Sequence, residues 1–325
     1  MNPLNWTSLW LHQNFEQCRY RPFGAADQRL CPVPDEWRPD LEQIYLSLST
    51  SPDSGRAKFR GVPCRAQRVR TVDGTSSYVL RRLPHADSLA ALGVPPPVVN
   101  VLLDPGLRGL ILVAGRQGAG KTTLAGALVQ ERIQAYGGVA FAIEDPPEMS
   151  IQETLAYGII QQIAVDSAPD GLPPRERIGW HTRNAVRSSV DLLFVGEVRD
   201  SPEASAVVMQ SGIGGPVITT IHADSVESAL VRLIALAAKD MGIEGAAAQV
   251  AEHVAVVLHL DLSAKTVQTR RKDEEETPPL LVLTADMLRI EDRDSALRDA
   301  IRHQDFSRIR EAALGQRTRR VQQQF

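Results

Sequence analysis

The sequence has few cysteines, little net charge and no long apolar run. Its three cysteines, Cys18, Cys31 and Cys64, lie in the first fifth of the 325 residues and form no C-x-x-C pair. This pattern suits reduced thiols and argues against a disulfide framework or a cysteine zinc site. The formal net charge of -3 supplies no global attraction to nucleic acid, whose binding proteins usually carry a basic field.

No stretch of the sequence approaches the roughly 20 apolar residues that a membrane-spanning helix needs. Any membrane association is therefore expected to be peripheral. The hydrophobic share of 43% and the charged share of 23% are close to globular averages, which argues against a wholly disordered or fibrous chain. A chain of 325 residues can bury a full core, and the usual domain sizes favour two domains over one.

The apolar pattern divides the chain into a small N-terminal part and a larger C-terminal part. In the first part, alternating apolar and polar residues flank the turn signal at 72–75, and a helical pattern runs over 41–48. We therefore expect a small α+β domain of PAS-like type over residues 1–85. A proline-containing linker is expected over 86–97, because its prolines interrupt regular structure.

Beyond the linker, short apolar runs alternate with amphipathic helical patterns. The apolar runs are 110–114, 139–143, 192–195 and 217–221. This alternation indicates an α/β fold with a mostly parallel sheet covered by helices on both faces. We expect this domain to extend over residues 98–325 and to end in short helices.

A glycine-rich segment, Gly115-Arg-Gln-Gly-Ala-Gly-Lys-Thr122, separates the first apolar run from the next helical pattern and has the spacing of a phosphate-binding P-loop. Its backbone is expected to wrap a phosphate group at the helix N-terminus. The glycines that allow this are Gly115, Gly118 and Gly120. Lys121 is expected to neutralise the β- and γ-phosphates, Thr122 to coordinate Mg²⁺ and Thr123 to assist at the α-phosphate. The expected ligands are ATP and Mg²⁺.

The other three apolar runs also end in residues suited to this chemistry. Glu144 and Glu148 follow the second run, Glu197 ends the third and His222 ends the fourth. Because ligands collect at the carboxyl ends of parallel strands, these side chains are expected near the nucleotide. Glu197 occupies the Walker B position, where it is expected to hold Mg²⁺ or to orient a water molecule. Glu144 or Glu148 could polarise that water. The alternatives are that 144–148 is a proline-rich turn with a capping acid and that His222 is an ordinary surface or core histidine.

The succession of these motifs resembles the motor ATPases of type II secretion, type IV pili and type IV secretion, a family similar to GspE and PilT. Members share four motifs called Walker A, Asp box, Walker B and His box. The matching segments are 115–122, 144–148, 191–200 and 214–222. The segment 79–96 is also similar to the family's interdomain link, so the resemblance covers residues 60 to about 240.

The resemblance implies a RecA-like ATPase core and a hexameric ring in which arginines of the small domain reach a nucleotide. By spacing, Arg65 and Arg81 are the matching candidates; each could instead be a solvated strand arginine. The resemblance also implies a cytoplasmic protein, peripheral at the inner membrane. There it would act on a membrane-embedded platform protein to drive pilus dynamics, protein secretion or conjugative transfer.

The sequence leaves the subfamily and two other functions open. No cysteine follows Cys64, so the zinc motif typical of type II secretion and pilus-extension motors is absent, which favours a retraction or conjugation type. The His box 221–225 resembles type IV secretion ATPases, whereas the Asp box resembles pilus motors. A DNA-handling RecA-like motor, such as a helicase or recombinase, shares the expected fold. An ATP-binding subunit that assembles a ring without hydrolysis is the third possibility.

Overall fold

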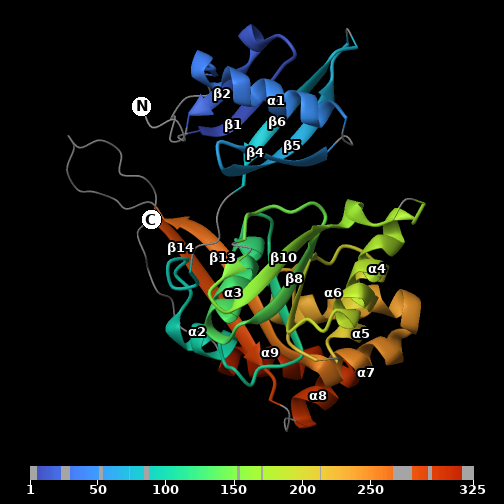
Figure 1. The fold of residues 1–325 in the computed structure, drawn as a ribbon. Helices are drawn as coiled ribbons and strands as arrows, with labels where there is room; N and C mark the ends of the chain where they lie inside the picture. The colour runs from blue at the N-terminus through green and yellow to red at the C-terminus, as the bar shows by residue number, and fades with distance from the viewer. Residues whose placement is uncertain are drawn as a thin grey trace, which may run out of the picture. The chain divides into compact units, whose positions relative to one another are not determined.

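The computed structural model describes residues 6–22, 30–50, 54–72, 74–83, 88–151, 154–169, 171–212, 214–265, 280–291 and 295–316. Contacts divide the chain into two compact units. The first is Met1–His85 with Glu148–Ser150, and the second is Ala86–Pro147 with Ile151–Phe325. Figure 1 draws the first unit mainly in blue and cyan and the second from green to red.

The first unit is a six-stranded sheet with one α-helix, in strand order β3-β2-β1-β6-β5-β4. Its elements are β1 (Trp6–Leu11), η1 (Phe15–Gln17), β2 (Arg19–Pro22), β3 (Cys31–Pro32), η2 (Asp35–Trp37), α1 (Arg38–Ser49), β4 (Ser54–Phe59), β5 (Val62–Arg70) and β6 (Ser76–Arg82). Leu41 and Leu48 of α1 are buried in the same apolar core as Trp6 and Phe59. The unit is therefore α+β, as the sequence predicts.

All three cysteines of the sequence lie in the first unit and are free thiols. Cys18 and Cys64 are buried, whereas Cys31 is half-buried. Burial raises the pKa of the Cys64 thiol to about 11. This thiol is therefore protonated at neutral pH and unreactive, because the thiolate is the nucleophilic form.

The second unit contains an eight-stranded sheet in the order β14-β13-β7-β12-β11-β8-β10-β9. Its strands are β7 (Leu110–Gly115), β8 (Gly138–Glu144), β9 (Thr154–Leu155), β10 (Gly158–Ala164), β11 (Leu192–Glu197), β12 (Val217–His222), β13 (Val254–Lys265) and β14 (Leu280–Arg289). The six central strands are parallel, and the edge strands β9 and β14 are antiparallel to their neighbours. The expected mostly parallel α/β sheet is confirmed.

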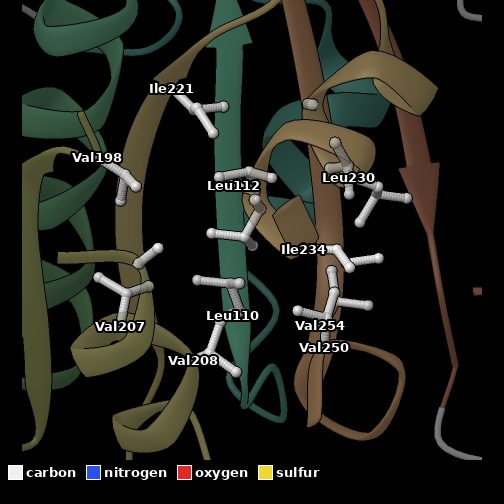
Figure 2. Packing of buried hydrophobic residues seen from close by; sticks show 14 of the residues in the cluster. Leu110, Leu112, Val198, Val207, Val208, Ile221, Leu230, Ile234, Val250 and Val254 are labelled. Atoms are coloured by element: carbon white, nitrogen blue, oxygen red, sulfur yellow. The ribbon is translucent and has the colours of Figure 1, made fainter. Parts of the chain in front are cut away.

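Helices cover both faces of this sheet. They are α2 (Pro96–Leu102), α3 (Lys121–Tyr136), α4 (Pro174–Arg187), α5 (Ser201–Gln210), α6 (Val226–Met241), α7 (Ile243–His253), α8 (Ser295–Arg302) and α9 (Phe306–Gly315), with the 3-10 helix η3 (Val165–Ser167). Figure 2 shows Leu110 and Leu112 of β7 packed with Val207 of α5, Leu230 of α6 and Val250 of α7. This apolar layer fixes β7, the strand that leads into the P-loop.

The segment 86–97, expected to be a linker, is partly helical. The prolines of segment 86–97 do not all form a connector, since Pro96 and Pro97 begin α2, where the first turn tolerates proline. Among the described residues, no helix is both long enough and apolar enough to cross a membrane.

Gly215 precedes β12 and lies close to the backbone of Asp191, which precedes β11. A Cβ at Gly215 would overlap the carbonyl oxygen of Asp191. Gly215→Ala should therefore lower the free energy of unfolding by about 1–3 kcal/mol, because the backbone must move to admit the methyl group. Thermal denaturation measures this loss as a lower Tm.

The control for this prediction is Gly245→Ala in helix α7. There the nearest atom to an added Cβ is Met241 Cβ at 3.9 Å, so the methyl group has space. Replacing a helical glycine by alanine should raise stability by about 0.5–1 kcal/mol. A Gly215→Ala protein as stable as wild type would contradict the close approach of β11 and β12.

Candidate functional site

Four adjacent parallel strands bring the predicted site residues to one edge of the sheet in the second unit. β7 ends at Gly115, β12 at His222, β11 at Glu197 and β8 at Glu144. In the register of the sheet, His222 pairs with Gly115, and Glu197 pairs with Thr220, two residues before His222. Segments that are up to about a hundred residues apart in the chain therefore meet at the carboxyl ends of their strands.

The backbone of the P-loop uses three glycines that other residues could not replace without strain. Gly118 has φ 78° and Gly120 has φ 86°, both in the left-handed region, and Gly115 has φ 154°. A Cβ at Gly115 would lie 2.6 Å from the carbonyl oxygen of Leu260. In the described part of the chain, no heavy atom lies within 4 Å of the Cβ position at Gly118 or Gly120. The backbone therefore has open space beside Gly118 and Gly120.

Helix α3 begins directly after this loop, at Lys121, with Gly120 as its N-cap. Gly120 has no side chain that could cap this end of the helix. The N-terminus of a helix carries a partial positive charge, so it suits a phosphate group. The predicted P-loop residues Lys121, Thr122 and Thr123 thus form the first turn of α3.

A chain of contacts links the P-loop lysine to the Walker B glutamate. Lys121 Nζ donates to the carbonyl oxygen of Arg116 at 3.0 Å and lies 3.3 Å from His222 Nδ1. His222 Nε2 lies 2.7 Å from Glu197 Oε1. An ammonium group has only donors, so Nδ1 of His222 is the acceptor in its contact with Lys121. His222 therefore connects two side chains predicted to act on the same ligand.

Arg199 completes this chain of contacts, although the sequence analysis did not single it out. Its Nε donates to Glu197 Oε2 at 2.8 Å, and its Nη1 donates to the carbonyl oxygen of Asp145 at 3.4 Å. The hydrogen bond to Glu197 raises the pKa of Arg199. In the sequence, Arg199 is marked only by its place in the segment 196–200, which reads Gly-Glu-Val-Arg-Asp. That pattern does not show that the arginine contacts the glutamate.

Of the two Asp-box glutamates, Glu144 belongs to this edge of the sheet. It is the last residue of β8 and is only 2% exposed. Its Oε1 accepts a hydrogen bond from Gln162 Nε2 at 2.8 Å. Glu148 is assigned to the first unit, and its expected place near the nucleotide stays a prediction. The sequence offered no way to separate the two carboxylates.

The two predicted small-domain arginines lie side by side in the first unit. Arg65 of β5 and Arg81 of β6 are directly paired across the antiparallel ladder. Their side chains therefore project from the same face of the sheet. Their expected approach to a nucleotide stays a prediction.

An apolar pocket of about 210 Å³ adjoins the P-loop. Its lining residues are Leu92, Ala119, Gly120, Thr123, Leu124, Leu260, Leu262 and Leu283. Apolar walls next to a phosphate-binding turn suit a flat nucleotide base, whose ring faces are apolar. The sequence did not reveal this pocket, because its leucines come from segments far apart in the chain and resemble ordinary core residues.

The residues present fit a nucleotide with Mg²⁺. The glycine loop offers an open cradle for phosphates, and the pocket offers a surface for the base. Within the described residues, no three His, Cys, Asp or Glu side chains converge as a metal site. Mg²⁺ commonly needs only one or two protein groups beside substrate phosphates and water. The Thr122 hydroxyl and the Glu197 carboxylate would be those groups.

Comparisons with curated proteins find relatives that match 63% of the chain. The chain is 30% identical over 215 residues to the type II secretion system protein HxcR of Pseudomonas aeruginosa, covering 63% of this chain and 42% of HxcR. It is 33% identical over 214 residues to the type II secretion system protein E of Klebsiella pneumoniae, covering 63% of this chain and 39% of that protein. The chain thus spans about two fifths of the length of these relatives.

Two solved structures share the fold over nearly the whole chain. The pilus retraction motor PilT with bound ADP matches with a TM-score of 0.73 at 20% identity, covering 97% of this chain and 87% of PilT. The ATPase DotB of Legionella pneumophila matches with a TM-score of 0.71 at 20% identity, covering 96% of this chain and 85% of DotB. At this identity the likeness establishes the fold, which is the RecA-like core preceded by a small domain that the sequence predicts.

A family model described as "Type II/IV secretion system protein" matches residues 55–290. The match includes the P-loop, the ends of β8, β11 and β12, and the strands β5 and β6. It therefore covers most of the chain and every residue of the candidate site. The chain belongs to the type II/IV secretion system protein family.

Proposed function

We propose that the chain is a ring-forming, hexameric ATPase that couples hydrolysis of ATP to mechanical work in pilus dynamics, protein secretion or conjugative transfer. One observation carries the enzymatic part of this proposal. The P-loop lysine, a histidine and the Walker B glutamate form a continuous chain of contacts at the strand ends, from Lys121 through His222 to Glu197. Family membership supports the type of machine.

Phosphate binding is assigned to the P-loop. The ε-ammonium of Lys121 is held by the Arg116 carbonyl oxygen, so its side chain already lies along the loop instead of extending into solvent. Lys121 is only 6% exposed, which means that its charge acts in a setting of reduced solvent screening. The ammonium would neutralise the β- and γ-phosphates, while Thr123 would contact the α-phosphate beside the apolar pocket.

The acidic residues are assigned to the attacking water and the metal. When bound, Mg²⁺ would supply positive charge that offsets the charge developing on the phosphates. Thr122 and Glu197 would hold it, and His222 would keep the Glu197 carboxylate in place while sensing the γ-phosphate. Glu144 is the candidate for orienting water, since its carboxylate lies at the end of β8. Glu148 remains a second candidate.

The proposal extends to partners and place. A ring of identical subunits would let Arg65 and Arg81 of one subunit stabilise charge at a neighbour's nucleotide. The platform partner would be a membrane-embedded protein of the machine, so this chain would act at the cytoplasmic face of the inner membrane. A DNA-handling motor remains the rival, but no contact or match described above favours it. Stimulation of phosphate release by single-stranded DNA would support that rival.

Lys121→Ala tests the phosphate site. Loss of the ammonium should lower kcat/KM for ATP at least ~100-fold, because charge on the transferring phosphoryl group is left uncompensated. Phosphate release measures the effect, and circular dichroism confirms that the fold is retained. Lys239→Ala, at an exposed lysine of α6, is the matched control and should leave the rate unchanged. Normal hydrolysis by Lys121→Ala would overturn the assignment of the phosphate site to the P-loop lysine.

Glu197→Gln tests the Walker B assignment. The amide keeps the shape of the side chain but loses its charge, so kcat should fall about 100-fold to 1,000-fold. ATP binding should persist, which isothermal titration can measure beside the steady-state rate. The control Glu244→Gln changes an exposed glutamate of α7. Equal kcat in Glu197→Gln and wild type would exclude Glu197 from the reaction.

Mixing two inactive variants tests whether the arginines act between subunits. Arg65→Ala/Arg81→Ala subunits carry an intact P-loop, and Lys121→Ala subunits carry intact arginines. In an equimolar ring, about a quarter of the contacts between subunits should combine both intact halves and regain hydrolysis. Each variant alone should stay inactive. Phosphate release that does not rise on mixing would show that the arginines do not act on a neighbour's nucleotide.

A further inference from the structure

Gln162 touches both ends of the Asp-box loop with one side chain. It lies on β10, which pairs with β8 in parallel register. Its Nε2 donates to Glu144 Oε1 at 2.8 Å, at the residue where β8 ends. Its Oε1 accepts from the backbone N–H of Ile151 at 3.3 Å, where the chain leaves the loop. The residues between these two contacts are 145–150.

A glutamine is the side chain that suits this position. Glu144 is 2% exposed, and a buried carboxylate needs hydrogen-bond donors to replace lost water. The Ile151 N–H is itself a donor, so it must face an acceptor. A side-chain amide offers a donor and an acceptor on one planar group, and the two partners fix which atom faces which. The orientation of Gln162 is therefore determined by the loop that it holds.

We propose that Gln162 is a positioning residue for Glu144 in the proposed hydrolysis reaction, and this inference rests on that proposed function. By bonding to both ends of the loop, Gln162 fixes the direction of the Glu144 carboxylate relative to the backbone of the loop. The hydrogen bond from Arg199 to the Asp145 carbonyl oxygen adds a third anchor and connects the loop to Glu197. A shift of the loop is thus transmitted to the orientation of Glu144.

The sheet itself supplies a matched control. Gln161 precedes Gln162 on β10 and is exposed, and successive strand residues point to opposite faces of a sheet. Substitutions at Gln161 therefore change the same residue type in the same strand without reaching Glu144. Any effect limited to Gln162 arises from its contacts and not from a general weakening of β10.

The first experiment compares Gln162→Leu with Gln161→Leu in the full chain. Gln162→Leu should lower kcat about 10-fold to 100-fold, as loss of a supporting hydrogen bond does around other reactive groups. KM for ATP should stay within about 2-fold, because the P-loop contacts are unchanged and the lost interaction acts on the chemical step. Gln161→Leu should match wild type in both constants.

The second experiment uses Gln162→Glu and Gln161→Glu to separate positioning from a purely structural role. A carboxylate at position 162 would stand beside Glu144, and two carboxylates that share a site keep a proton to higher pH. If Glu144 acts as an ionised group, the acid limb of the kcat profile of Gln162→Glu should move to higher pH by about 1 unit or more. Gln161→Glu should leave that limb in place.

The outcomes separate this inference from the function on which it rests. Wild-type protein that releases no phosphate from ATP overturns the proposed function and the inference with it. Active wild type with an unchanged kcat in Gln162→Leu overturns the inference alone. If Gln162→Leu lowers both kcat and Tm and Gln162→Glu does not shift the acid limb, Gln162 has a structural role. That result also overturns the inference. If Gln162→Leu does not fold, the acid limb of Gln162→Glu decides.

Discussion

The parallel register of β8, β11, β12 and β7 is the constraint on which the site depends. β7, β11 and β12 are buried along almost their whole length, and β8 is buried at its carboxyl end. Their apolar residues fix the register, and the polar residues at the strand ends emerge at the same edge. A slip by one residue in any strand would turn its last side chain to the other face. The apolar layers between sheet and helices therefore determine which polar groups can meet.

The polar groups at this edge form one connected set rather than separate motifs. Lys121, His222, Glu197 and Arg199 contact one another in sequence, and Arg199 also holds the Asp145 backbone. These four side chains come from three of the four motifs found in the sequence, and the contact with Asp145 reaches the fourth. A ligand that displaces one member, such as a phosphate at Lys121, changes the surroundings of the others.

The sequence predicts those features that short segments encode. A P-loop, the alternation of buried strands with helices, and polar residues at strand ends are all local patterns, and the family resemblance places them together. Gln162, Arg199 and the apolar pocket depend on pairing between distant strands, so a polar residue inside β10 or a leucine of β13 carries no local signal. Strands β2 and β3 escape prediction because they are short, and β1 because its apolar residues do not alternate regularly with polar ones. The positions of Arg65, Arg81 and Glu148 relative to a nucleotide likewise require contacts that no local pattern contains.

The pocket beside the P-loop has a consequence for base discrimination. Apart from Thr123, every residue that lines it has an apolar side chain or none. An apolar surface rejects a base of similar shape only weakly, because strong discrimination requires polar groups that are left unpaired by the wrong ligand. In the proposed ATPase, the phosphates would therefore contribute most of the selective binding. Other purine nucleoside triphosphates would compete with ATP unless backbone groups of the pocket read the base edge.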